Sequence, residues 1–155
     1  MWFSRSLMLV GLSLASVLAL ADTLIVEEAQ VRAVPPVSTT TAAFMLLRNP
    51  GEQDLAVLGA FSPAAENTEL HNHVEEDGVM QMRRVQAINV PAGGSVELAP
   101  GGLHLMLIDL VETLEEGDQV ELTLELDNAE RVTFEAPVKL IEVMDEGVDH
   151  GHHAH

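Results

Sequence analysis

The feature that most constrains the fold is a series of short apolar stretches, separated by turn residues, that continues from residue 24 to residue 138. Many of these stretches are rich in β-branched residues or alternate between apolar and polar side chains, which is typical of strands. Helical periodicity is nearly absent, and only 64–66 could form a short helical turn. The expected strands span residues 24–33, 39–48, 54–61, 69–74, 79–85, 88–90, 95–98, 103–110, 119–126 and 131–138. This regular spacing predicts an all-β sandwich or small barrel, formed as a single domain.

The N-terminal residues 1–21 have the pattern of a secretory signal peptide. They combine Arg5 in a short positive segment, an apolar run over 7–18 and small residues before a cleavage point at Ala21. The apolar run is short for a membrane anchor, so we expect cleavage after Ala21 and export to the periplasm. No cysteine follows, so we expect no lipoprotein anchor. The folded domain is then expected to span residues 22–143.

The charge balance and the absence of cysteine exclude several classes of protein. The chain has 25 acidic and 7 basic residues, a net charge of −18. Such an acidic surface is unsuited to nucleic acid and attracts cations and basic partner surfaces. A blue-copper electron carrier is excluded because that centre needs a cysteine thiolate. No arrangement of a nucleophile with a base stands out, so we expect no enzymatic activity.

Four potential metal donors lie between residues 71 and 106. They are His71, Met82, His104 and Met106, separated by ten, twenty-one and one residues. Imidazole nitrogen binds several transition metals, whereas thioether sulfur favours Cu(I). Because the chain offers no thiolate, two imidazoles with two thioethers point to monovalent copper.

The stretch 103–110 predicts how two of these donors are presented. Side chains two residues apart in a strand lie on the same face. His104 and Met106 should therefore share one face, and the opposite face should carry Leu103, Leu105 and Leu107. The leucine face is the natural core face, so the two donors should point away from the core.

The same alternation places His71 with His73 and Met80 with Met82. The turn at 75–78 contains an Asp-Gly pair, which is typical of a β-hairpin. We expect this hairpin to bring His71 back beside Met82 or Met80. Together with the strand at 103–110, the hairpin would let four donors converge at one edge of the sandwich.

These residues and their surroundings resemble a known family, the periplasmic copper chaperones called PCu(A)C proteins. The resemblance covers roughly residues 24–134 and includes the donor spacing H-x10-M-x21-H-x-M. It also includes the segments VRAVPP, RNPG, SPAAENTELH, GVMQMR, INVPAGGSVEL and PGGLHLMLIDL.

The resemblance implies both a fold and a function. The implied fold is a cupredoxin-like Greek-key β-sandwich, and the implied cargo is one Cu(I) ion at an exposed site. The family's ligands fall on His71, Met82, His104 and Met106. The implied partners are cytochrome c oxidase subunit II, whose CuA centre receives the copper, and Sco-type copper proteins. We expect the chain itself to be a monomer.

Two residues near the site leave the ligand set open. Many members of the family carry a methionine two residues after the first histidine, and this chain has His73 there. His73 is either an alternative donor or a surface histidine. Met80 lies on the same expected face as Met82 and could substitute for it, although the spacing favours Met82.

The C-terminal residues 144–155 contain few core formers and are expected to be a disordered tail. The tail is either native or a purification tag, and its sequence, which is no plain hexahistidine run, favours a native tail. Its histidines suit Cu(II), zinc or nickel, and the tail is therefore a second candidate metal site, for Cu(II). These residues are His150, His152, His153 and His155.

Two other functions stay open on the sequence alone. One is a periplasmic copper buffer for resistance, which would need no dedicated client. The other is a metal-free interaction sandwich, in which the spacing of histidine and methionine would be coincidental.

Overall fold

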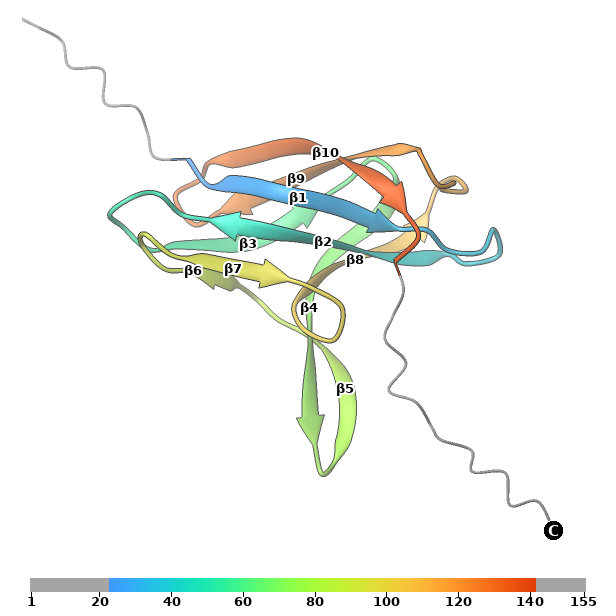
Figure 1. Cartoon of the computed structure of the whole chain (residues 1–155), viewed down its shortest axis with the longest axis horizontal. Coiled ribbons are helices and arrows are strands. Elements are labelled where there is room, and N and C mark those ends of the chain that lie inside the picture. The colour runs from blue at the N-terminus through green and yellow to red at the C-terminus, as the bar shows by residue number, and fades with distance from the viewer. Residues whose placement is uncertain (1–22, 142–155) are drawn as a thin grey trace, which may run out of the picture.

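The computed structural model describes residues 23–141, which form ten strands and no helix (Figure 1). The all-β expectation is therefore confirmed, and no helix in this part is long and apolar enough to cross a membrane. The expected signal peptide and tail lie outside the described residues. The strands are β1 (Ile25–Arg32), β2 (Thr40–Arg48), β3 (Leu55–Phe61), β4 (Ala65–Glu76), β5 (Val79–Arg84), β6 (Ile88–Val90), β7 (Ser95–Leu98), β8 (His104–Leu110), β9 (Gln119–Leu126) and β10 (Arg131–Lys139).

Most strands end where the turn residues predict, and β4 is the main exception. Residues 64–66 do not form the short helical turn that their sequence allowed, because β4 already begins at Ala65. Ala65 pairs with Leu110 of β8, and the main-chain N–H of Val111 donates to the carbonyl of Ala64 at 3.0 Å. Pairing with a strand distant in sequence therefore overrides a weak local preference for helix.

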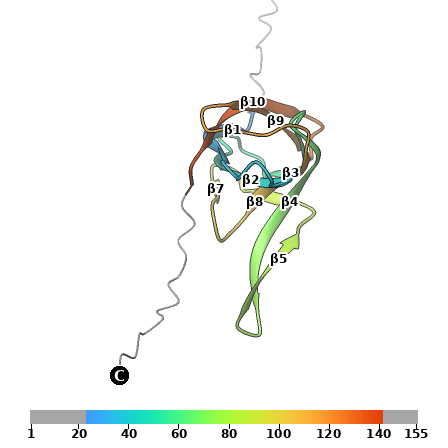
Figure 2. The ribbon, with the colours of Figure 1, turned by 90° about the vertical axis from the view of Figure 1, so that its right-hand side faces the viewer.

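The strands form one continuous sheet in the order β5-β4-β8-β2-β1-β10-β9-β3-β6. β7 and β8 pair with the same edge of β2. β8 pairs with residues 40–43 and β7 with Met45–Arg48. The pairs are antiparallel except for β1 with β10, which run parallel. The sheet curls so that its two halves face one another without closing, as the end view in Figure 2 shows. β4 and β8 are distant in sequence but pair side by side in the sheet. Together these two strands carry three of the expected donors.

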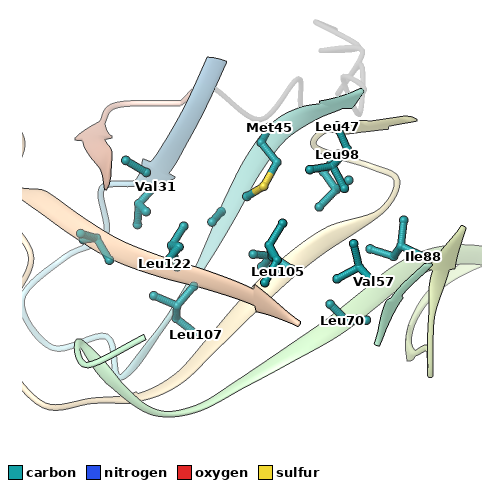
Figure 3. Close-up of a cluster of buried hydrophobic side chains, with 14 of the residues drawn as sticks. Val31, Met45, Leu47, Val57, Leu70, Ile88, Leu98, Leu105, Leu107 and Leu122 are labelled. Atoms are coloured by element: carbon teal, nitrogen blue, oxygen red, sulfur yellow. The ribbon is translucent and has the colours of Figure 1, made fainter. Parts of the chain in front are cut away.

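The core lies inside this curled sheet and is almost entirely aliphatic (Figure 3). Leu47 of β2, Leu105 and Leu107 of β8 and Leu122 of β9 have no exposed surface. Complete burial of a leucine side chain contributes about 2 kcal/mol to the free energy of unfolding. Because the chain has no cysteine, this apolar packing stabilises the domain without disulfides.

The hairpin of β4 and β5 extends away from the body of the sheet (Figures 1 and 2). Its turn is formed by Asp77 and Gly78, which have φ angles of 52° and 77°. Two successive residues with positive φ define the type I′ turn that suits the twist of a hairpin. Every residue of β5 is exposed, so this strand is held mainly by its pairing with β4.

Candidate metal centre

The strand register brings the expected donors onto one face of three adjacent strands. His71 of β4 lies opposite His104 of β8, and the ring centroids are 5.8 Å apart. His73 lies opposite Met82 of β5, and its ring centroid is 5.2 Å from that of His104. Met106 follows His104 by two residues and therefore shares its face. The structure thus gathers these five side chains at the base of the hairpin.

The opposite face of β8 is apolar, as its alternation predicts. Leu105 and Leu107 are fully buried in the core, whereas Met106 between them is only partly buried. His104 is on the donor face yet only 2 % exposed. Other side chains on its own face cover it, among them Phe44 of β2, whose ring centroid lies 6.3 Å away.

The expected hairpin register is wrong by two residues. The two-residue turn at Asp77 and Gly78 pairs Glu76 with Val79, which sets His73, and not His71, opposite Met82. His71 instead lies opposite Arg84. The signal was present in the sequence, because an Asp-Gly type I′ turn has two central residues and so fixes the register.

The His104 ring is held in one tautomer. Its Nδ1–H donates to the main-chain carbonyl of Gly102 at 2.9 Å, which leaves the lone pair on Nε2. Burial lowers the pKa of His104 below 6.5, and the hydrogen bond to Gly102 and the neighbouring histidines have smaller effects. The ring is therefore neutral at pH 7, which is the form that binds a metal ion.

A hollow of about 160 Å³ lies beside His104. Residues of five strands line it, and β4, β5 and β8 contribute His73, Met82, His104 and Met106. Met82 is 44 % exposed, so the hollow opens toward solvent on the hairpin side. A cavity with two thioethers and two imidazoles in its wall fits a soft monovalent metal ion.

His71 is absent from the wall of this hollow. Its Nε2–H donates to Oε2 of Glu69 at 2.8 Å, and the other oxygen of Glu69 lies 3.5 Å from Nη1 of Arg84. Its Nδ1 is buried and has no hydrogen-bond partner within the described residues. His71 is thus close to the other donors but oriented by a carboxylate.

Met80, a further expected donor, lies away from the hollow. Met80 is opposite Glu75 near the tip of the hairpin, is 56 % exposed and does not line the hollow. The four tail histidines lie outside the described residues. Residues 23–141 contain no group of three or more His, Cys, Asp or Glu side chains placed to hold a metal ion. A metal bound at the hollow would therefore depend on the thioethers.

Sequence reasoning missed three residues around the site. Glu69 could have been found, because it lies two residues before His71 and so shares its face. Phe44 and Arg32 line the hollow and could not have been found from the sequence. Their positions depend on the pairing of β1 with β2 and of β2 with β8.

Comparison with known families identifies relatives of this domain. The family described as "Putative lipoprotein LpqE-like" matches residues 24–138. The chain belongs to this LpqE-like family. A curated relative, "Putative lipoprotein Lxx21020" of Leifsonia xyli subsp. xyli (strain CTCB07), is 37% identical over 120 residues, which cover 77% of this chain and 71% of the relative.

Solved structures relate this LpqE-like chain to PCuAC domains. The Cu(I) form of DR1885 from Deinococcus radiodurans is 34% identical with a TM-score of 0.63, covering 81% of this chain and 83% of that protein. The copper-bound PCuAC domain from PmoF2 is 26% identical with a TM-score of 0.65, covering 76% and 93%. The cupredoxin-like β-sandwich implied by the resemblance is therefore confirmed, as is kinship with copper-binding domains.

Proposed function

We propose that this LpqE-like chain is a copper carrier that binds one Cu(I) ion at the hollow beside His104. The observation that carries the proposal is the wall of the hollow, where Met82 and Met106 meet imidazoles from β4 and β8. Thioether sulfur favours Cu(I) over harder ions. The structures of copper-bound PCuAC domains with the same fold support this assignment. The resemblance assigns the β4 donor to His71.

The donor set suits transfer better than permanent storage. Thioethers and neutral imidazoles carry no negative charge, so they should hold Cu(I) less tightly than thiolates. A partner that offers cysteines could then take the ion through intermediates in which both proteins share it. Such an exchange requires an accessible site, and the exposure of Met82 provides one.

The proposed acceptor is the CuA centre of cytochrome c oxidase subunit II, reached directly or through a Sco-type thiol protein. This step rests on the resemblance to PCu(A)C proteins. A periplasmic copper buffer without a dedicated client is the alternative, and the two differ in whether copper moves to subunit II. The experiment mixes the copper-loaded chain with a purified subunit II domain and follows the CuA absorption spectrum. Copper transfer to subunit II supports the chaperone, and no transfer supports the buffer.

Export to the periplasm forms part of the proposal. The sequence of residues 1–21 and the lipoprotein names of the relatives support it. We propose that the mature chain works as a monomer after cleavage at Ala21. Mass spectrometry of the protein recovered from periplasmic extract would give the mature N-terminus.

Competition with a Cu(I) chelator tests the central step. The wild-type chain should take one tight equivalent, and Met82→Leu should weaken binding by tenfold or more. Met80→Leu is the matched control, because Met80 is an exposed methionine of the same strand outside the hollow. Equal behaviour of the two variants would contradict the proposal.

A further inference from the structure

Glu69 of β4 contacts one imidazole of the site and lies beside a thioether. Its Oε2 accepts Nε2–H of His71 at 2.8 Å, and strand pairing sets it opposite Met106 of β8. A carboxylate is not a ligand that Cu(I) prefers, so its place there calls for another role. We propose that Glu69 is a positioning residue of the copper site, which holds His71 in the tautomer that leaves Nδ1 free for Cu(I).

The hydrogen bond decides which nitrogen of His71 carries the proton. An ionised carboxylate can only accept, so Nε2 of His71 donates and its Nδ1 keeps the lone pair. That Nδ1 is buried and has no hydrogen-bond partner within residues 23–141. A histidine that binds a metal almost always donates its other ring N–H to a carboxylate, a carbonyl or water. The bond to Glu69 therefore gives His71 the arrangement of a metal ligand that binds through Nδ1.

The strand register holds Glu69 beside two of the expected ligands. Glu69 and His71 lie two residues apart on the donor face of β4, and Leu70 between them is buried in the core. The register pairs Glu69 with Met106 and His71 with His104. The carboxylate thus has one ligand next to it along its own strand and another across from it on β8.

Arg84 of β5 holds the other side of this carboxylate. Its Nη1 lies 3.5 Å from Oε1 of Glu69, and the register places Arg84 opposite His71. One oxygen of Glu69 therefore faces the guanidinium, and the other faces the imidazole. The Arg84 side chain is 70 % exposed, and an ion pair exposed in this way contributes little to stability. The better shielded contact of Glu69 is the one to His71, whose side chain is only 14 % exposed.

His71 and His104 then offer different nitrogens to the metal ion. The carbonyl of Gly102 holds His104 with its proton on Nδ1, and Glu69 holds His71 with its proton on Nε2. The expected ligating atoms are therefore Nε2 of His104 and Nδ1 of His71, on rings whose centroids are 5.8 Å apart. Because the two rings have separate partners, a change at Glu69 should alter His71 and leave His104 as an internal reference.

The inference rests on the proposed function, since it takes Cu(I) as the cargo, but its first test needs no copper. Long-range nitrogen–proton NMR correlations of the full chain show which ring nitrogen carries the proton, and at about pH 8 an unperturbed imidazole is neutral. The four tail histidines are changed to asparagine in every sample. The wild type and Glu69→Gln, which keeps an acceptor oxygen, should have the proton of His71 on Nε2. Glu69→Leu should lose this preference, and the pattern of His104 should stay the same throughout.

Copper binding gives the second readout. Loss of an outer hydrogen-bond partner typically weakens metal binding by about 10- to 100-fold, so Glu69→Leu should weaken Cu(I) binding by about tenfold or more. Glu69→Gln should stay within about threefold of the wild type, because its amide oxygen can still accept from His71. Addition of Cu(I) to the wild type should shift the resonances of Nδ1 of His71 and Nε2 of His104. Glu66→Leu is the matched control, since it replaces an exposed glutamate of the same strand, and it should change neither readout.

The outcomes separate the two proposals. A proton on Nδ1 of His71 in the wild type, or an unchanged Cu(I) affinity in Glu69→Leu, would overturn the inference and leave the copper carrier intact. An equal loss of affinity in Glu69→Gln and Glu69→Leu would also overturn it, since the carboxylate would then act through its charge. Wild-type protein that binds no Cu(I) would overturn both proposals.

Discussion

The ring of His104 is tied to the carbonyl of Gly102 by a 2.9 Å hydrogen bond from Nδ1. Because a carbonyl can only accept, this bond places the proton on Nδ1 and leaves Nε2 free. His104 is also nearly without solvent exposure, so its neutral form is favoured. The backbone of the chain thus holds this imidazole in the neutral tautomer whose Nε2 lone pair is free, which is the form that the proposed copper site requires.

The two faces of β8 should be separable by mutation. Met106→Leu conserves volume and should change the free energy of unfolding by less than about 1.5 kcal/mol while weakening Cu(I) binding. Leu107→Ala removes a fully buried side chain and should cost about 3 kcal/mol while leaving the affinity of the folded protein nearly unchanged. Urea unfolding and chelator competition measure the two effects. Loss of copper binding in both variants would contradict the division into faces.

Stability should fall in mild acid because of His104. Its pKa is lowered in the folded state, so the unfolded chain takes up a proton at higher pH than the folded chain does. The stabilisation is fully present above pH 6.5 and is lost as the pH falls through the folded pKa. Urea unfolding at pH 7.5 and pH 5 should show this decrease, and His104→Gln should reduce it. An unchanged pH dependence in the variant would contradict the assignment.

The hairpin turn should control the order of β5 without affecting the core. Gly78 has a φ of 77°, which a side chain disfavours, although nothing lies within 4 Å of a Cβ added there. Gly78→Ala should therefore cost about 1 kcal/mol through backbone strain alone. Amide exchange should become faster over Val79–Arg84 and stay unchanged in β9. Asp77→Asn is the control, since asparagine tolerates positive φ, and equal exchange in both variants would count against the turn assignment.

A buried amide far from the donors gives a stability prediction independent of copper. Asn49 is 1 % exposed, and its Nδ2 donates to the carbonyls of Gln53 and Val90 at 2.7 and 3.1 Å. Its Oδ1 accepts the N–H of Gly51 at 3.0 Å. Asn49→Ala leaves these groups without partners and should cost about 2 kcal/mol or more. The exposed Asn89 is the control. Thermal unfolding should show a lower stability for Asn49→Ala and no change for Asn89→Ala.

Local signals in the sequence predict much of this fold. Proline, glycine and Asp-Gly turns mark strand ends, and alternation separates Leu105 and Leu107 from His104 and Met106. These features depend on neighbouring residues, which is why β6, β7 and β9 have the expected bounds. The early start of β4 depends on its pairing with β8, which is distant in sequence and was missed for that reason.

The candidate site was predicted less completely than the fold. The spacing identified the strands that carry the donors, but it could not show the bond between His71 and Glu69, nor which histidine lines the hollow. These depend on side-chain rotamers and on the loop at Gly102, which no periodicity encodes. The roles of His71, His73 and Met80 as donors or bystanders therefore remain predictions for experiment.

The central claim is that thioethers make this a Cu(I) site, and paired affinities for the two copper ions test it most directly. Cu(I) and Cu(II) binding would be measured for the full chain and for Met82→Leu with Met106→Leu, both with the tail histidines changed to asparagine. The account predicts a much larger loss of affinity for Cu(I) than for Cu(II). Equal losses for the two ions, or no loss of Cu(I) binding, would contradict it.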